Sequence, residues 1–418
     1  MDNPGPAAKV AAMQTRPEVR FLDRTTPPHI VTLVALAGLA ALAMNVFLPS
    51  LPSMAEHFAT DYSTMQLSVA LYLAMNAVLQ VVIGPVSDRF GRRPVILWSC
   101  VLFMAATVGC LLAPTVEIFL AFRMAQAVIV AAMVLSRAIV RDLFEQDEAA
   151  SMIGYVTMGM ALVPMVGPAV GGMLDDLFGW QANFVMLLVA GALVMAVAWA
   201  DQGETASNRP ARLVQQFREY PELLTSRRFW GYCAAAAFSS GAFFAYLGGA
   251  PFVGSNVYRL DPSTLGLFFG APALGYAVGN YLSGRYSVRY GINRMIVAGA
   301  AICSGGLAVS LGLSLAGFNT APLFFGFMTF VGLGNGMTLP NATSGMLSVR
   351  PHLAGTASGL GGAIMIGGGA GLSALAGALL VPGAGAFPLQ WIMLATSVAA
   401  LAAILYVMHR ERQIAPGA

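Results

Sequence analysis

Charge is scarce in this sequence, yet it is concentrated in the short stretch GPVSDRFGRRP at 84–94, which lies between two long apolar runs. Only 10% of the 418 residues are charged, against about 25% in an ordinary soluble domain. In this stretch a single acid, Asp88, stands with Arg89, Arg92 and Arg93. A carboxylate can accept hydrogen bonds from helix N-terminal amides and can pair with arginine, so these residue types can join helix ends. The simpler interpretation of the three arginines is that they anchor a turn at a membrane surface.

The other reactive residue types form no catalytic or metal-binding pattern. The four cysteines, Cys100, Cys110, Cys233 and Cys303, fall within apolar runs and form no CxxC pair, which is typical of packing residues. The four histidines are scattered near the ends of apolar runs, so we predict no metal site. With a single lysine, Lys9, the sequence cannot contain a GxxxxGK[ST] phosphate loop. We therefore predict that the protein is not an enzyme and needs no cofactor.

Long apolar segments must position these residues. Hydrophobic residues make up 57% of the chain, and the mean hydropathy is +0.72. Segments close to the ~20 residues that cross ~30 Å of hydrocarbon recur throughout. The sequence predicts an all-α polytopic membrane protein with twelve transmembrane helices, near residues 30–50, 65–85, 95–113, 118–140, 150–173, 182–200, 230–252, 263–284, 294–316, 321–340, 354–379 and 387–407.

The basic residues predict the orientation of these helices. Of the 22 Lys and Arg residues, all but Arg123 and Arg259 fall on one face if the N-terminus is cytoplasmic, as the positive-inside rule requires. The net charge of +3 then follows from topology and does not indicate nucleic-acid binding. The predicted divisions are a cytoplasmic tail at 1–28, a six-helix bundle at 29–200, a cytoplasmic linker at 201–229, a second six-helix bundle at 230–408 and a cytoplasmic tail at 409–418.

The two halves of the chain repeat each other. The stretch GPVSDRFGRRPVIL at 84–97 aligns with GRYSVRYGINRMIV at 284–297, at an offset of 284 − 84 = 200 residues. Both copies follow the second span of their half, and parallel six-helix repeats are a transporter architecture. The acid is not repeated, because Asp88 aligns with Val288. The identical pairs are Gly84 with Gly284, Ser87 with Ser287, Arg89 with Arg289 and Gly91 with Gly291.

At this point a family resemblance becomes specific. The stretch at 84–94 resembles the signature between helices 2 and 3 of the major facilitator superfamily, whose fold has two six-helix halves that rock to give alternating access. Several further stretches resemble the Bcr/CflA branch of drug:proton antiporters: FLPSLPSMAEHF at 47–58, SRAIVRDLF at 136–144, FFAYLGGAPFV at 243–253, LPNATSGML at 339–347 and AGTASGLGGA at 354–363. VPMVGPAVGGML at 163–174 resembles the helix 5 antiporter signature, with its GPxxGG core. The resemblance covers about residues 30–408.

The resemblance implies two structural devices. The first is a cytoplasmic gate in which Asp88 holds the halves shut and Arg92 pairs with Asp142 at the end of helix 4. The second is a kinked, closely packed helix 5 that seals the interface between halves against leakage of the driving ion. The gating residues are Gly84, Asp88, Arg89, Gly91, Arg92, Arg93 and Asp142, and the antiporter residues are Pro164, Gly167, Pro168, Gly171 and Gly172. The alternative for the latter set is that these small residues only pack helices together.

The coupling proton has no obvious carrier. The Bcr/CflA branch usually has an Asp in helix 1 before the LPxLP stretch, but Asn45 occupies that position here, and all 19 acids fall in tails, loops or span ends. Arg123, in a sequence that resembles the family's helix 4 RxxQ signature, cannot be deprotonated. It could instead bind an anionic or electron-rich substrate, or reach to lipid headgroups. Candidate replacement acids near the outer span ends are Glu56, Asp61 and Glu117.

Polar and aromatic residues within the spans could line a cavity or bond to neighbouring helices. They are Asn45, Tyr72, Asn76, Gln80, Arg123, Gln126, Tyr246, Asn280, Asn335 and Asn341. Mixed aromatic and amide linings suit loosely specified lipophilic ligands. The first functional hypothesis is a monomeric exporter of chloramphenicol- or bicyclomycin-like drugs in the bacterial inner membrane, surrounded by lipid and coupled to proton influx. The second is a facilitator-fold exporter of a specific metabolite or amino-acid product with altered ion coupling.

Overall fold

A computed structural model describes residues 19–143, 163, 166–205, 223–350, 354–381 and 383–414. Every regular element in these ranges is helical. Ten of the described helices are long and apolar enough to cross a membrane. Each predicted span coincides with a described helix or with two in succession, except that only the last part of the fifth span is described. The all-helical prediction is therefore confirmed.

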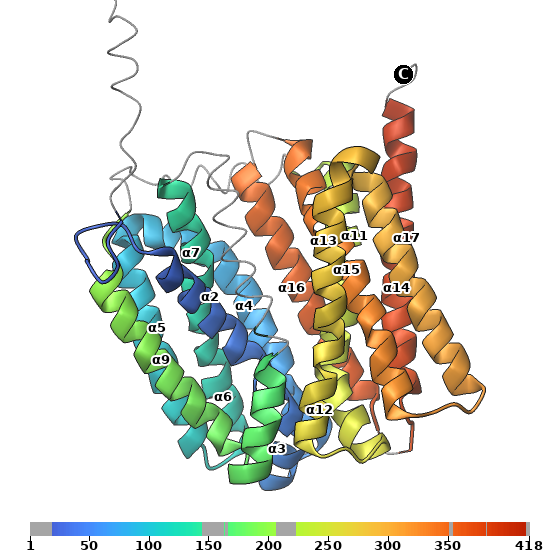
Figure 1. Ribbon diagram of the computed structural model, residues 1–418, viewed down its shortest axis with the longest axis horizontal. Coiled ribbons are helices and arrows are strands. Elements are labelled where there is room, and N and C mark those ends of the chain that lie inside the picture. The colour runs from blue at the N-terminus through green and yellow to red at the C-terminus, as the bar shows by residue number, and fades with distance from the viewer. Residues whose placement is uncertain are drawn as a thin grey trace, which may run out of the picture.

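The N-terminal half of the described chain consists of the helices from α2 to α9 (Figure 1). Its first segment is broken twice, because Pro49 and Pro52 cannot continue the helix that ends at Asn45 and instead begin new turns. The fourth segment contains a short 3-10 turn between two α-helices. The elements are α2 (Ile30–Asn45), η1 (Leu48–Ser50), α3 (Leu51–His57), α4 (Tyr62–Phe90), α5 (Arg92–Leu112), α6 (Val116–Gln126), η2 (Ala127–Ile129), α7 (Val130–Leu143), a helix over 166–178 and α9 (Gln181–Asp201).

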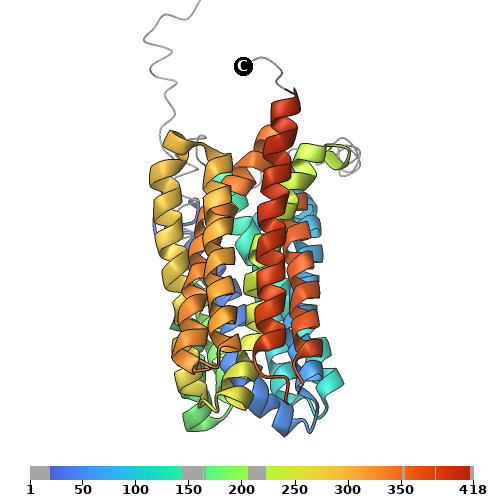
Figure 2. The same ribbon diagram turned by 90° about the vertical axis from the view of Figure 1, so that its right-hand side faces the viewer.

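The C-terminal half consists of the helices from α11 to α17, which stand beside the first half (Figures 1 and 2). Helix α16 packs along α4, and this pair makes the most extensive contact between the halves. The elements are α11 (Arg227–Phe252), η3 (Val253–Val257), α12 (Pro262–Phe268), α13 (Gly270–Tyr290), α14 (Ile292–Leu315), α15 (Ala321–Val349), α16 (Ala354–Leu379) and α17 (Phe387–Ile414). Helix α17 continues to Ile414, so most of the predicted tail at 409–418 extends a membrane helix.

The repeat seen in the sequence has the same backbone geometry in both halves. Gly91 has φ 94° and ψ 152°, and Gly291 has φ 84° and ψ 152°. Each of these glycines donates its N–H to the carbonyl of the serine four residues before it, at 2.9 Å. A non-glycine residue is strained in this region of φ and ψ. The glycines thus let one helix stop and the next begin within a single residue.

Among the described residues, only the first copy of this turn receives an acid from a distant segment. Glu204, just after α9, accepts the backbone N–H of Arg92 at 2.8 Å and that of Arg93 at 3.2 Å. These amides open α5, and Gly91 has no side chain to cap them, so a carboxylate from a distant segment satisfies the helix N-terminus. The sequence analysis assigned the capping chemistry of this turn to Asp88 alone and missed Glu204.

The backbone of this turn generates a stability prediction. We expect Gly91→Ala to lower the free energy of unfolding by about 1–3 kcal/mol, because a residue with a Cβ is strained at this φ. The added Cβ would also collide with Glu204 Oε2. Thermal unfolding in detergent measures the effect. Gly291→Ala isolates the backbone strain, since its Cβ would meet no atom within 4 Å, and Gly84→Ala, also without a close neighbour, is the unstrained control. Equal melting temperatures for all three variants would contradict the prediction.

Candidate functional site

A buried arginine lies at the centre of the N-terminal half. Arg123, in the last turn of α6, is only 1% exposed. Its Nη1 donates to Gln126 Oε1 at 2.6 Å and its Nη2 donates to the Ala43 carbonyl at 2.7 Å. Among the described residues no carboxylate pairs with this guanidinium. A buried charge without a counter-ion costs several kcal/mol, so its surroundings must supply other stabilisation.

Two aromatic rings supply that stabilisation. The guanidinium carbon of Arg123 lies 4.3 Å from the centre of the Phe47 ring and 4.2 Å from that of Tyr72. Such contacts contribute about 2 kcal/mol or more when they are shielded from water. Phe47 sits at the break between α2 and η1, so the proline-induced kink places its ring against the arginine. The first, second and fourth membrane segments therefore meet at one cation.

The RxxQ pair is part of a hydrogen-bonded chain. Gln126 accepts from Arg123 and donates its Nε2 to Thr107 Oγ1 on α5 at 2.8 Å, and Thr107 in turn donates to the Phe103 carbonyl. All of these side chains are buried. The network locks Arg123 in one rotamer and adds the third membrane segment to the cluster. We call Phe47, Tyr72, Arg123 and Gln126 the arginine cluster.

Two polar atoms on the neighbouring residues have no partner among the described residues. They are Oδ1 of Asn45, whose Nδ2 donates to the Ala41 carbonyl at 2.8 Å, and the hydroxyl of Tyr72. Both residues are at most 1% exposed. A buried polar atom without a partner costs about 1–3 kcal/mol. These two atoms are therefore buried without a described partner, and the binding role of Asn45 and Tyr72 stays a prediction.

The other predicted cavity residues do not join this cluster. Asn335 accepts from Ser239 on α11, and Asn341 donates to Ser283 on α13, so both hold neighbouring helices of the second half together. Asn280 donates to a carbonyl of its own helix, Tyr276. Gln80 donates to Asn76 one turn away on α4. Asn335 and Asn341 therefore follow the alternative of bonding to neighbouring helices, whereas the hydrogen bonds of Asn280 and Gln80 stay within their own helices and favour neither alternative.

Tyr246 is buried but lies in an aromatic cluster of the C-terminal half. Its ring is 5.1 Å from that of Phe269 and 6.3 Å from that of Phe325, measured between ring centres. Its hydroxyl has no partner among the described residues. It therefore resembles Tyr72 in offering one unpaired polar atom within an apolar environment.

The helix over 166–178 approaches the neighbouring segments very closely. A Cβ on Gly171 would lie 1.8 Å from the Val46 carbonyl oxygen, and one on Gly172 would lie 2.0 Å from that of Pro262 in the other half. Gly266 of α12 approaches the Pro168 carbonyl oxygen in the same way, at 2.3 Å. The predicted small-residue motif thus packs against both the kink in its own half and α12. Gly167 makes only ordinary contacts, and Pro164 lies outside the described residues.

Hydrogen bonds between the halves occur at the end of the molecule remote from the described C-terminus. Within the described ranges, these interhalf bonds are Tyr62 Oη to the Gly248 carbonyl at 2.8 Å, Gln66 Nε2 to Ser373 Oγ at 2.7 Å, and Ser263 N to Asp176 Oδ2 at 3.1 Å. We call this region the closed end. It also contains the close backbone approach between Gly172 and Pro262.

The N-terminus of α12 at the closed end receives carboxylates from both halves. Its own cap, Asp261, accepts from Ser263 Oγ at 2.5 Å and from Thr264 N at 2.9 Å, and these hydrogen bonds lower the pKa of Asp261 to about 2. Asp176 adds the bond from the other half. Because the pKa of Asp261 is depressed, this cap is lost only as pH falls toward 2. It is present throughout the physiological range.

Acids near the closed end differ in their exposure. Glu56, Asp61 and Glu117, the candidate replacement acids, are all exposed. Asp175 is buried, with 9% of its surface exposed, and accepts from Ser53 Oγ at 2.9 Å. The sequence analysis treated Asp175 as a span-end residue like the others. No sequence signal separated it from Asp176, because which of two adjacent acids faces inward depends on the helix rotation.

At the opposite end, the predicted gate is only partly described. Arg89 is exposed and lies over its neighbour Phe90, with 5.4 Å between the guanidinium carbon and the ring centre. Arg92 donates from Nη1 to Ser87 Oγ, and Arg93 donates from Nη2 to the Trp199 carbonyl at 3.1 Å. The side chains of Asp88 and Asp142 lie outside the described residues, so their roles remain predictions.

With this geometry established, the chain can be compared with known proteins. The family model for the major facilitator superfamily matches residues 33–371. The chain belongs to this superfamily. A chloramphenicol resistance protein of Pseudomonas aeruginosa is 31% identical over 78% of this chain and 79% of its own. A bicyclomycin resistance protein homolog of Haemophilus influenzae is 29% identical over 93% of this chain and 98% of its own.

A solved structure has the same fold. A bacterial homolog of the human lysosomal transporter Spinster, in an inward-facing and occupied conformation, covers 92% of this chain and 96% of its own, with a TM-score of 0.69 and 18% identity. The family and the fold predicted from the sequence are therefore confirmed. The protein is a multi-pass membrane transporter and not an enzyme, and its relatives include proteins named for drug resistance.

The arginine cluster generates a prediction that separates packing from polar contact. We expect Tyr72→Leu to destabilise the transporter by about 2 kcal/mol, because it removes one of the two rings that face the Arg123 guanidinium. Tyr72→Phe keeps the ring and removes a buried hydroxyl that has no described partner, so it should unfold at the temperature of the parent. Thermal unfolding in detergent compares the two variants. If Tyr72→Phe is as unstable as Tyr72→Leu, then the hydroxyl, and not the ring, supports the fold.

Proposed function

We propose that this transporter exports lipophilic small molecules across a bacterial inner membrane by alternating access, driven by proton entry. The observation that carries the proposal is the closed end. The described hydrogen bonds between the halves all lie there, so the halves can separate at one end of the molecule while they meet at the other. That arrangement is one of the two states that an alternating-access cycle requires.

The distribution of arginines supports an orientation with both termini cytoplasmic. Arg89, Arg92 and Arg93 lie at the end of the molecule opposite the closed end, as do the turns at 285–294 and the end of α17. Arg259 lies near the closed end. Under the positive-inside rule the arginine-rich end is cytoplasmic. The structure then corresponds to a state shut toward the periplasm and available to substrate from the cytoplasm.

The arginine cluster supports the substrate class. The buried groups in and beside it are aromatic faces, the amide of Asn45 and one phenolic hydroxyl, which would suit an uncharged ligand of mixed polarity once they are exposed to it. The relatives named for chloramphenicol and bicyclomycin resistance support the same class. We therefore propose neutral, lipophilic antibiotics of this kind as substrates.

A proposal of proton coupling needs a titratable group that changes its environment during the cycle. Among the described acids, Asp175 and Asp201 are the buried ones. Asp201 accepts from Leu22 N, His29 N and Thr32 Oγ1, so it anchors the segment before α2. Asp175 lies beside the closed end, where burial disfavours a charged carboxylate and opening would hydrate it. We propose Asp175 as the proton-responsive acid that replaces the one missing at position 45.

The two motifs from the sequence analysis keep distinct proposed roles. The close approaches at Gly171, Gly172 and Pro168 support helix 5 as the seal of the periplasmic side. The turn at 84–94 is proposed as the cytoplasmic gate, in which Asp88 engages the other half when the periplasmic side opens. In the present state that contact is not required, and Glu204 satisfies the start of α5.

One observation favours a second candidate function. Arg123 is a buried cation with no carboxylate partner among the described residues, so the carboxylate of an anionic metabolite could fill that role. This candidate is an exporter of a specific acidic product. It differs from the first in needing the charge of Arg123 for recognition of the substrate.

The decisive experiment is growth of a pump-deficient bacterium that expresses this chain, across a panel of antibiotics. We expect expression to raise the inhibitory concentration of chloramphenicol-like neutral drugs, and an uncoupler to abolish this protection. Arg123→Gln, compared with the parent at equal expression, distinguishes the two candidate functions. If the second candidate is right, this variant should lose the export of carboxylate-bearing compounds specifically. No change in resistance to any lipophilic drug would overturn the first candidate.

Proton coupling through Asp175 predicts a change in pH dependence. Protonation of Asp175 should favour the closed end and ionisation should weaken it, so export by the parent should vary with external pH. Asp175→Asn is permanently neutral and should transport at a rate that varies much less between pH 5 and 8. Export into buffers of stepped pH, from cells or proteoliposomes, measures the profile. Glu56→Gln, an exposed acid nearby, is the matched control, and an unchanged profile in Asp175→Asn would contradict the proposal.

A further inference from the structure

A cavity lies at the arginine-rich end of the C-terminal half, far from the arginine cluster. Its volume is about 420 Å³, and it forms where α11 begins, α15 ends and α17 passes. The residues that line it are Thr225, Ser226, Arg227, Arg228, Val349, Arg350 and Arg410. Among the residues that the structure describes, four arginines and no acid line one small cavity, in a chain where only one residue in ten is charged.

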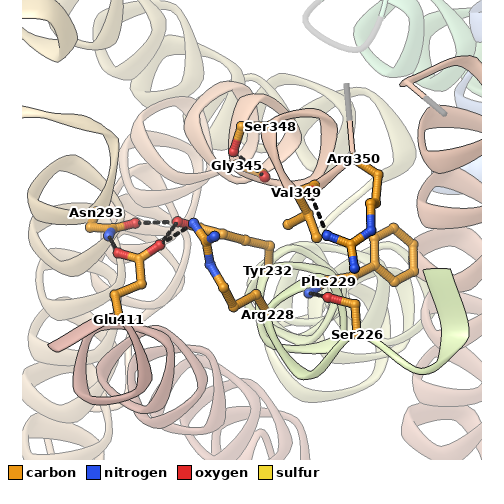
Figure 3. A network of polar contacts seen from close by, with 10 residues as sticks. All are labelled: Ser226, Arg228, Phe229, Tyr232, Asn293, Gly345, Ser348, Val349, Arg350 and Glu411. Carbon is orange, nitrogen blue, oxygen red and sulfur yellow. Dashed lines mark hydrogen bonds and ion pairs between the residues drawn. The ribbon is translucent and has the colours of Figure 1, made fainter. Parts of the chain in front are cut away.

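The nearest described acid is directed toward one of these arginines. Glu411 accepts from Arg228 Nη2 at 2.6 Å, from Asn293 Nδ2 at 2.6 Å and from Tyr232 Oη at 3.2 Å. Figure 3 shows these groups converging on the Glu411 carboxylate, on one side of Arg228. Glu411 thus balances Arg228 and orders the side of the cavity formed by α17. It is not itself a lining residue.

The remaining arginines are held by other groups or project outward. Arg410 donates from Nη1 to Gln413 Oε1 at 2.8 Å. Because Gln413 is neutral, this contact does not balance the charge of Arg410. Arg350 donates to the Val349 carbonyl at 3.3 Å, and Figure 3 shows its side chain extending toward the first turn of α11, near Ser226. Arg227 is exposed in that same turn. Guanidinium groups from three elements therefore surround the cavity.

This donor set matches a phosphate group. Arginine forms bidentate hydrogen bonds to phosphate oxygens, and several guanidinium groups can share one phosphate. The hydroxyls of Thr225 and Ser226 line the same cavity and can add short hydrogen bonds. The site requires an anion with several acceptor oxygens, which could reach it as a free anion or as part of a lipid headgroup.

The surroundings of the cavity favour the lipid. Trp230 lies three residues after Arg227 and is 43% exposed, with its Nε1 donating to the Leu224 carbonyl at 2.7 Å. Tyr406 lies four residues before Arg410 and is 47% exposed. Residues at these helical spacings share a face of the helix. An exposed aromatic side chain therefore stands on the membrane side of Arg227 and of Arg410. Trp and Tyr are enriched where membrane helices meet headgroups, and basic pockets between such helices bind anionic lipids.

We propose that this cavity binds the phosphate headgroup of an anionic phospholipid, with the acyl chains lying beside Trp230 and Tyr406. The bound lipid joins the ends of α11, α15 and α17, which belong to one half of the transporter. It therefore stabilises that half as a unit and does not occupy the substrate site. The proposal is independent of the substrate and of proton coupling.

The test measures thermal stabilisation of the full-length transporter in a mild uncharged detergent. Titration with phosphatidylglycerol should raise the melting temperature of the parent, and titration with zwitterionic phosphatidylcholine should not. Arg227→Gln combined with Arg410→Gln should require about ten-fold more phosphatidylglycerol for the same shift. The matched control combines Arg285→Gln with Arg294→Gln, which removes two exposed arginines of the same half outside the cavity and should titrate as the parent does.

Further arms separate the two sources of phosphate. Inorganic phosphate and glycerol phosphate at millimolar concentration should give no shift if the acyl chains contribute as proposed. Stabilisation by these soluble anions without any effect of phosphatidylglycerol would overturn the lipid assignment. Equal weakening in the cavity and control variants would show a general surface-charge effect and would also overturn it. Arg227→Lys combined with Arg410→Lys should lie between the parent and the Gln variant, because lysine keeps the charge but loses the bidentate geometry.

Discussion

A close backbone contact between the helix over 166–178 and α12 joins the two halves at one end of the molecule. A Cβ on Gly172 would lie 2.0 Å from the Pro262 carbonyl oxygen, and one on Gly266 would lie 2.3 Å from that of Pro168. Only glycine permits this approach, and it allows Asp176 to reach the start of α12. The interhalf hydrogen bonds of Tyr62 and Gln66 lie at the same end. Close packing here therefore holds the two halves together at the closed end.

The arginine cluster depends on a related device in the first helix. Pro49 and Pro52 end α2 early, and the resulting kink places Phe47 against Arg123 and the Val46 carbonyl against Gly171. One break in the chain thus serves both the buried cation and the close packing of the helix over 166–178, the proposed seal. A conformational change that moves the seal must also act on the segment that holds Phe47. This physical link connects the closed end to the proposed binding residues.

Much of the fold could be predicted from the sequence, because a membrane limits the chain to long apolar helices whose ends are marked by arginine, glycine and proline. The repeated turn at Gly91 and Gly291 could be recognised in the sequence because glycine and arginine mark both of these helix ends. Side-chain partners were less predictable. Glu204 caps α5 from 112 residues away, and Asp175 is buried while Asp176 is exposed, which depends on helix rotation. Asn335 and Asn341 share a residue type with Asn45, yet they bond to adjacent helices.

The two halves therefore use their polar residues differently although they share the repeated turn at Gly91 and Gly291. In the N-terminal half a charge is buried at Arg123, and two nearby polar atoms lack described partners. In the C-terminal half the comparable amides are satisfied between α11, α13 and α15, and the arginines gather at the membrane surface. A buried polar atom without a partner gains when a bound molecule supplies one. Such atoms occur in both halves, since the hydroxyl of Tyr246 also has no partner among the described residues. In the N-terminal half they lie beside the buried Arg123, so substrate recognition is expected to depend mainly on the contacts around this cation.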